Sequence, residues 1–262
     1  MHIGTLLLSI FAATLGLHTV VIDPGHGGKD TGAVSKDKKT YEKTLVLDIS
    51  RRLGQMIDEA YPDVTVYYTR TTDKFIPLQT RADIANDRKA DLFISVHINA
   101  NNKTAPSGHS VHVLGESSIP GRDLQSGNLD VCKRENSVIT LEDDYKTAYQ
   151  DFDPDDDASY FFMTLIQSAY YEQSVYFASL VEDELVRGPI KVKRGVEQNP
   201  FYVLWKTAMP SVLLELGFIT NEADLALLRS ENGRQQIASR VFDAFRKYKK
   251  AYDDSMKIET AN

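Results

Sequence analysis

Short runs of β-branched and aromatic residues alternate with helical periodicity over residues 18–114. The run Thr19–Asp23 predicts a strand, and apolar residues at three- and four-residue spacing from Leu45 to Met56 predict an amphipathic helix over 41–60. Further strands are expected at 64–68, 91–97 and 109–114, and a second helix at 78–89. This alternation indicates an α/β fold, in which helices flank a mostly parallel, twisted sheet.

The same pattern resumes after a long interruption. We expect a helix over 172–186, a final buried strand over 211–216 and a helical end over 222–251. With 262 residues the chain can form one sizeable core. We therefore expect a single main domain over 18–251, followed by a polar tail over 252–262.

The interruption at 115–170 is acidic, with 12 Asp or Glu residues against 4 Lys or Arg residues in a chain of net charge −7. Such a segment is most often a solvated excursion. Its apolar runs Tyr160–Met163 and Leu165–Ile166 nevertheless need a packing partner. We expect a partly helical, folded insertion over the sheet edge or over the mouth of the functional site.

The apolar run Thr5–Leu17 resembles the hydrophobic region of a secretory signal, although no Lys or Arg precedes it. We expect residues 1–17 to be a signal peptide or its remnant, and an N-terminal core strand or helix is the alternative. No segment is apolar for long enough to predict a stable membrane span.

Composition limits which metal ligands and which binding partners are possible. Because Cys132 is the only cysteine, an intramolecular disulfide is excluded and a metal would have to be held by His and carboxylate groups. The negative net charge and the absence of a long Lys/Arg run argue against nucleic-acid binding.

Two histidines directly follow predicted strands, at the sheet edge where α/β folds form ligand sites. His26 follows the first strand in a glycine-rich loop, and His97 ends the third. Either histidine alone is more often a hydrogen-bonded structural residue than a ligand. The loop lacks both phosphate-binding spacings, so a phosphate site is disfavoured.

Two glutamates add to this pattern. Glu42 lies at the predicted start of the first helix, where a carboxylate also suits the helix dipole. Two histidines and one carboxylate form a common catalytic zinc set. Glu215 lies inside the apolar final strand, where a carboxylate is normally paired, metal-bound or kept for a function; we favour a general base beside a metal, and an ion pair is the alternative.

These residues stand in four ordered motifs, Val21–Ala33, Glu42, Ser95–Ala100 and Leu213–Asn221. Together they resemble the zinc-dependent N-acetylmuramoyl-L-alanine amidases of bacterial cell walls. The resemblance covers residues 19–114 and 172 to the last helix. Ile98 departs from it, because the family usually has a smaller residue at this position.

The resemblance implies that His26, Glu42 and His97 bind one zinc ion and that Glu215 is the catalytic acid/base. It implies hydrolysis of the bond between N-acetylmuramic acid and L-alanine in peptidoglycan, by a protein exported across the inner membrane to the periplasm or cell envelope. Asn99, Arg81 and Arg194 are candidate substrate contacts, and a structural ion pair is an equal alternative for Arg81.

Some amidases of this kind carry an inserted helix whose carboxylate covers the zinc until a partner displaces it. Glu135 and Glu142 are the candidates here, with an activator protein acting on residues 115–170. A solvated edge cover or a wall of the substrate groove would explain the insertion equally well.

Two other functions remain open. The first is a zinc peptidase that cleaves within the stem peptide. The second is a peptidoglycan-binding regulator without activity, which would be expected to lack at least one of the four chemical residues, whereas all four are present.

Overall fold

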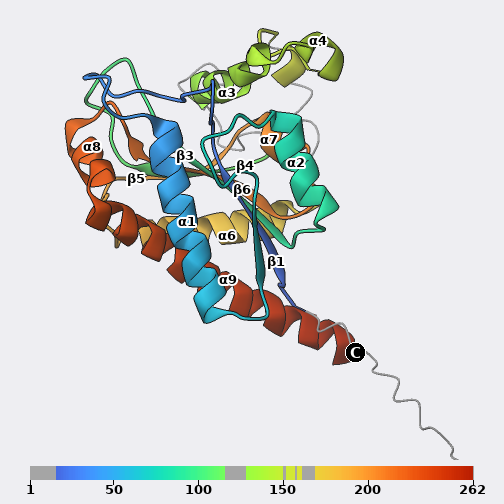
Figure 1. Cartoon of the computed structure of the whole chain (residues 1–262). Coiled ribbons are helices and arrows are strands. Elements are labelled where there is room, and N and C mark those ends of the chain that lie inside the picture. Colours follow the sequence, from blue (N-terminus) through green and yellow to red (C-terminus); the bar gives the residue numbers. More distant parts are fainter. Residues whose placement is uncertain (1–15, 116–127, 150–151, 157, 161–168, 262) are drawn as a thin grey trace, which may run out of the picture.

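A six-stranded sheet forms the centre of the molecule (Figure 1). The computed structural model describes residues 16–115, 128–149, 152–156, 158–160 and 169–261. The strands are β1 (Thr19–Pro24), β2 (Thr65–Tyr68), β3 (Leu92–Asn99), β4 (His109–Val113), β5 (Lys193–Gln198) and β6 (Ser211–Phe218), in the order β2-β1-β3-β6-β4-β5. Only the β4–β6 pairing is antiparallel, which confirms the mostly parallel α/β class.

The helices agree with the apolar periodicity over most of the chain. They are α1 (Glu42–Ala60), α2 (Leu78–Asp87), α3 (Asn128–Asn136), α4 (Tyr145–Ala148), α6 (Tyr171–Leu185), α7 (Tyr202–Trp205), α8 (Glu222–Arg229) and α9 (Glu231–Ala261), with a 3-10 turn, η1, at Ser137–Leu141. The sequence missed α7 and the edge strand β5, whose segment Lys193–Gln198 has few apolar residues.

The predicted last helix is two helices. Ser230 has an extended backbone between α8 and α9, and its hydroxyl oxygen accepts a hydrogen bond from the Gly233 amide, which caps the new helix. α9 then continues through the polar tail expected from residue 252.

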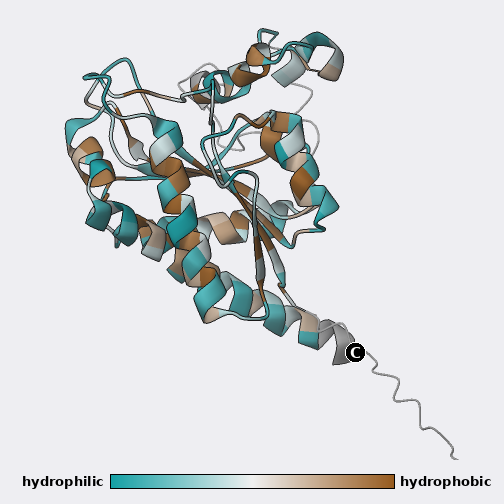
Figure 2. Cartoon of the chain, viewed as in Figure 1, coloured by the Kyte–Doolittle hydropathy of each residue, from teal (hydrophilic) through white to brown (hydrophobic). Residues whose placement is uncertain are grey.

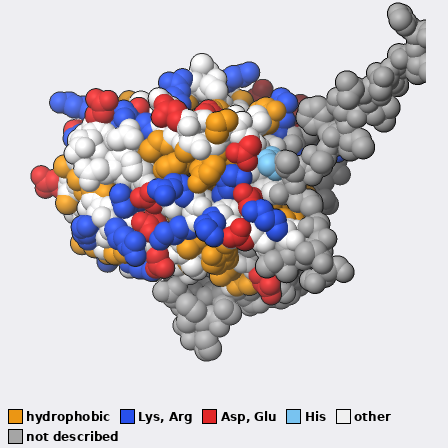
Figure 3. All heavy atoms as spheres, turned by 90° about the horizontal axis from the view of Figure 1, so that it is seen from below, with side chains coloured by type: hydrophobic (Ala, Val, Ile, Leu, Met, Phe, Trp, Pro, Cys, Tyr) orange, Lys and Arg blue, Asp and Glu red, His pale blue; other side chains and the backbone are white. Residues whose placement is uncertain are grey.

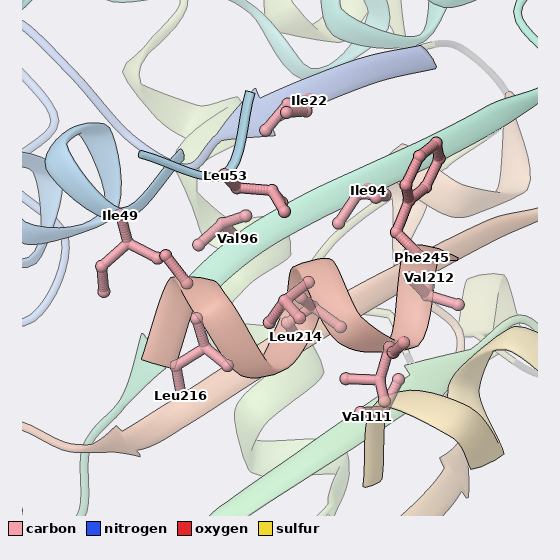
Figure 4. Close-up of a cluster of buried hydrophobic side chains, with 14 of the residues drawn as sticks. Ile22, Ile49, Leu53, Ile94, Val96, Val111, Val212, Leu214, Leu216 and Phe245 are labelled. Atoms are coloured by element: carbon pink, nitrogen blue, oxygen red, sulfur yellow. The ribbon is translucent and has the colours of Figure 1, made fainter. Parts of the chain in front are cut away.

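Helices α1, α6 and α9 cover one face of the sheet. Side chains that alternate along the strands, such as Ile94, Val96, Val212 and Leu214, pack there against Phe245 of α9 and its neighbours (Figure 4). In Figure 2 brown, apolar segments alternate with teal, polar ones along these helices. This fully buried layer fixes which strand residues point to the opposite face.

The opposite face is covered by α2, α7 and the described part of the insertion. Phe93 and Leu213 point to this side and join a second apolar cluster with Cys132 and Ile139 of the insertion and Phe201 before α7. Tyr160 is buried beside Phe152, whereas residues 161–166 of the predicted apolar runs lie outside the described residues. The described part of the insertion therefore packs against this face of the sheet.

The end of α9 meets the start of β1. Leu17 is buried, its amide donates to Asp253, and its carbonyl accepts from Lys249. Residues 1–15 of the predicted signal segment lie outside the described residues. Of the helices that the structure describes, none combines the length and the apolar character needed to cross a membrane.

The face seen from below in Figure 3 mixes basic and acidic side chains. Among the described residues, Glu184 of α6 contacts Arg187, just after that helix, and Lys247 of α9, and Asp243 of α9 contacts Arg240 and Arg246. This end lies opposite the carboxyl ends of the parallel strands, where the chemical residues gather.

Candidate active site

The loop after β1 presents His26 in a left-handed backbone conformation, with φ 60°. The Gly25 amide donates to the Val96 carbonyl oxygen, which joins the loop to β3. A Cβ atom at Gly25 would stand 2.4 Å from Cε1 of His97. Glycine at this position therefore lets the two histidines approach each other, and their ring centres are 4.8 Å apart.

Arg81 stabilises this loop through hydrogen bonds. It is 2% exposed and donates to Asp23 at 2.7 Å, to the Pro24 carbonyl at 2.9 Å and to the His26 carbonyl at 2.7 Å. Burial opposes ionisation of Asp23, but Arg81 and hydrogen bonds from Thr69 and Ser95 outweigh it and lower its pKa. Of the two roles left open for Arg81, these contacts favour the structural ion pair.

Glu42 is the first residue of α1 and is completely buried. Its Oε1 accepts from the Ile98 amide and its Oε2 from the Ala33 amide, both at 2.8 Å. Oε1 also lies 3.1 Å from His26 Nε2 and 3.2 Å from His97 Nδ1. The carboxylate is thus fixed by backbone donors and faces both histidines.

Glu135 of α3 completes the cluster. Its Oε2 is 3.2 Å from His26 Nε2 and 3.1 Å from His97 Nδ1. The four ligand atoms of His26, Glu42, His97 and Glu135 all lie within 4.8 Å of one another. Helix α3, in the described part of the insertion, therefore lies at the mouth of the site, the second of the two positions expected for the insertion.

The charges of these four groups shift one another's pKa. Burial opposes protonation of His97, but Glu135 and Glu42 raise its pKa to about 9. Burial also opposes ionisation of Glu42, yet the two histidines lower its pKa to about 2. The carboxylates thus favour protonation of His97, and the histidines favour ionisation of Glu42.

The donor set fits a zinc ion. His26 Nε2, His97 Nδ1 and Glu135 Oε2 are buried and have no hydrogen-bond partner among the described residues. Imidazole nitrogens and carboxylate oxygens at about 2 Å from the metal are typical zinc ligands, and a tetrahedral site places neighbouring ligand atoms about 3.3 Å apart. The four nitrogen-to-oxygen distances of 3.1–3.2 Å approach this spacing.

Glu215 lies beside this cluster on the same face of the sheet. Its Cα pairs with that of His97 in the β3–β6 ladder, and its side chain is completely buried. Burial is the main cause that raises its pKa, to about 8. A carboxyl group with this pKa can accept and return a proton near neutral pH.

The other candidate residues are placed differently. Asn99 borders the cluster, and its Oδ1 accepts from Arg134 at 3.3 Å. Arg194 lies on the edge strand β5 with its guanidinium 5.3 Å from the Phe218 ring centre, so its contact with substrate stays a prediction. Glu142 accepts a hydrogen bond from Tyr149 at 2.7 Å and is outside the four-residue cluster.

Sequence reasoning missed two residues of the site. Asp30 accepts from, or shares a proton with, His26 Nδ1 at 2.8 Å, which directs Nε2 toward the cluster. Its spacing of four residues from His26 was the available signal. Arg134, next to Glu135, contacts Glu215 Oε1 at 3.5 Å, and no local pattern in the sequence indicates this contact.

The sequence profile of the N-acetylmuramoyl-L-alanine amidases matches residues 20–247. The chain belongs to this family. The chain is 33% identical over 232 residues to the amidase AmiC of Escherichia coli O6:H1, a match that covers 87% of this chain and 52% of AmiC. It is 31% identical to the amidase AmiA of Escherichia coli K12, over 91% of this chain and 78% of AmiA. The chain thus spans about half the length of AmiC.

Solved amidases have the same fold. An N-acetylmuramoyl-L-alanine amidase from Clostridium difficile 630 superposes with a TM-score of 0.65 at 26% identity, covering 89% of this chain and 97% of that one. AmiC2 of Nostoc punctiforme gives a TM-score of 0.63 at 26% identity, with 88% and 96% covered. The family indicated by the four motifs and the α/β fold indicated by the alternating elements are therefore confirmed.

Proposed function

We propose that this protein hydrolyses the amide bond between N-acetylmuramic acid and L-alanine in peptidoglycan with one zinc ion. The observation that carries the proposal is the buried cluster of His26, Glu42 and His97 beside Glu215, on the sheet of an amidase-family domain. The three cluster residues are the proposed zinc ligands that remain when Glu135 moves away.

Bound zinc would act as a Lewis acid on the scissile carbonyl and make the attacking water more acidic. Glu215 takes a proton from that water as the water oxygen bonds to the carbonyl carbon. Glu215 then delivers the proton to the amide nitrogen as the carbon–nitrogen bond breaks. The products are the lactyl carboxylate of muramic acid and a stem peptide that begins with the amino group of L-alanine.

The insertion is proposed to hold the enzyme inactive. His26 and His97 are 7% and 6% exposed, because Glu135 and its helix cover them. Substrate cannot reach the cluster in this arrangement, so activity requires α3 to move. We propose that an activator protein binds the insertion and displaces it.

Location follows from the substrate. Peptidoglycan lies outside the cytoplasm, and the apolar run Thr5–Leu17 has the character of an export signal. We therefore place the protein in the periplasm or cell envelope.

Mass spectrometry of peptidoglycan fragments tests the reaction. The zinc-loaded protein should release intact stem peptides that start at L-alanine, and a chelator should stop this release. Glu215→Gln should abolish turnover and keep the zinc, whereas His97→Ala should lose both. Cleavage within the peptide would instead indicate a peptidase, and no cleavage even without residues 121–169 would indicate a binding protein. Zinc-stimulated turnover by Glu215→Gln would refute the role of Glu215.

A further inference from the structure

Arg134 contacts acceptors at the end of β3, directly after it, and in β6. Its guanidinium donates to Asn99 Oδ1 at 3.3 Å and to the Ala100 carbonyl at 3.1 Å, and it lies 3.5 Å from Glu215 Oε1. Nη1 contacts the two acceptors at the end of β3 and Nη2 contacts the β6 carboxylate, so the three acceptors surround the guanidinium group beside the ligand cluster. This position holds a cation in the structure.

The next residue places an anion at the neighbouring position. Glu135 Oε2 faces His26 and His97, while its Oε1 accepts from Arg134 Nε at 2.8 Å. The dipeptide Arg134–Glu135 therefore presents a cation to Glu215 and a carboxylate to the ligand cluster, with the two charges in contact.

Amide hydrolysis produces the same pair of charges. The carbonyl side becomes a carboxylate, and the nitrogen, after a proton from Glu215 and a second from solvent, becomes an ammonium group. Both groups start within bonding distance of each other. Glu215, having given up its proton, is then a carboxylate able to pair with the ammonium.

We propose that Glu215, Asn99 Oδ1 and the Ala100 carbonyl form an amine subsite that receives the α-amino group of L-alanine. Arg134 and Glu135 fill the closed site as an internal mimic of the two products. The assignment rests on the proposed amidase function. In this subsite Asn99 and Ala100 accept hydrogen bonds from the ammonium group. An ammonium group has three N–H donors, and the subsite offers three acceptors.

Competition between Arg134 and a peptide amine tests the subsite. The probes are a synthetic stem peptide that begins with L-alanine and the same peptide N-acetylated, titrated calorimetrically into the zinc-loaded full chain. Arg134→Gln should bind the free-amine peptide about tenfold tighter than the unmodified chain, since charged hydrogen bonds of this kind change affinity by that order. Affinity for the acetylated peptide should stay unchanged.

Three variants serve as controls. Lys146→Gln removes a charge from α4, where the ammonium lies over the Tyr145 ring, and should match the unmodified chain. Arg134→Lys keeps a cation in the subsite, so its affinity for the free-amine peptide should rise little. Adding Glu215→Gln to Arg134→Gln should remove the preference for the free amine, with thermal unfolding confirming that each variant is folded.

Either of two results would overturn the subsite. The first is that Arg134→Gln raises the affinity for both peptides equally. The second is that Arg134→Lys raises the affinity for the free-amine peptide as much as Arg134→Gln does. Amidase cleavage in the fragment assay separates the two ideas. Amine-selective binding without cleavage at L-alanine would support the subsite and refute the proposed reaction. Cleavage at L-alanine without amine-selective binding would support the proposed reaction and refute the subsite.

Discussion

A histidine in an unusual backbone conformation stands at the first turn of the site. His26 has a φ of 60°, which costs free energy for a residue with a Cβ atom. Hydrogen bonds from Arg81 and Arg70 to carbonyls of residues 24–26 hold that turn in place. The strain is therefore opposed by buried guanidinium groups together with hydrogen bonds inside the loop, such as that between the Gly27 amide and the Asp30 carbonyl.

His112 is another buried histidine, on the face of the sheet that carries His97. Asn199 Nδ2 donates to its Nδ1 at 2.7 Å, and the neutral ring can then donate from Nε2 to Ser110 Oγ at 3.0 Å. Burial, with a smaller effect of the Arg134 charge, lowers the pKa of His112 to about 3. The folded protein thus keeps this ring neutral where the unfolded chain protonates it.

Acid should destabilise the protein through His112. Between pH 6.5 and about 3 the unfolded state binds the extra proton, so the free energy of unfolding falls as the pH falls. From pH 8 to pH 5 this amounts to at most about 2 kcal/mol. Urea unfolding at both pH values should show a smaller drop for His112→Gln than for the unmodified chain. An equal drop in the two proteins would contradict this assignment.

At the scale of elements, the insertion is joined to the domain by specific contacts. Asn136 donates to the Pro200 carbonyl at 3.1 Å and accepts from the Tyr202 amide at 2.9 Å, which anchors the end of α3 to the start of α7. Lys29 donates to the Leu141 carbonyl on the other side of the site. These contacts set Glu135 over the cluster and would have to break when the site opens.

Removing the Glu135 charge should weaken that closure. In the intact chain, Glu135→Gln should retain zinc, because three protein ligands remain, and should raise amidase turnover about tenfold by increasing the open fraction. Glu142→Gln is the matched control in the same insertion and should leave turnover unchanged. A folded chain without residues 121–169 should be at least as active as Glu135→Gln.

The gating proposal can fail in two ways. A deletion variant no more active than the intact chain would show that the insertion does not inhibit. Loss of both zinc and turnover in Glu135→Gln would make Glu135 a permanent ligand.

At the scale of the whole molecule, the chemical residues lie on one face of the sheet, and the larger of the two apolar layers covers the other face. Residues such as Ile94 and Val96 build the core under α1 and α9, while the intervening Ser95 and His97 face the site. The alternation of a strand assigns every second residue to each side. The large apolar layer can thus hold the site rigid without contributing polar groups to it.

Metal binding should stabilise the entire domain. Zinc that binds only the folded state at about 1,000 times its dissociation constant adds about 4 kcal/mol, which corresponds to about 10 °C in the midpoint of thermal unfolding for a domain of this size. Chelation should lower the midpoint of the unmodified chain by that order. His97→Ala should show no shift, and His18→Gln, at the opposite end of β1, should shift as the unmodified chain does.

A midpoint that does not respond to chelation would argue against a metal at the cluster. A shift that survives His97→Ala would place the metal elsewhere.

The sequence by itself determined the alternating elements, the α/β class, the four family motifs and three residues of the ligand cluster. These depend on local periodicity and on residues that follow predicted strands, as with His26 and His97. It did not reveal β5 or α7, because their segments are short and lack a clear apolar period.

Only the tertiary structure decided which of Glu135 and Glu142 reaches the histidines and which groups Arg81 contacts. Glu135 and Glu142 are both acidic residues of one segment, but packing of α3 against Phe201 and Leu213 brings only Glu135 to the histidines. Arg81 faces Asp23 and the His26 loop because α2 packs over β1. Long-range packing sets such contacts, and periodicity along the chain carries no information about them.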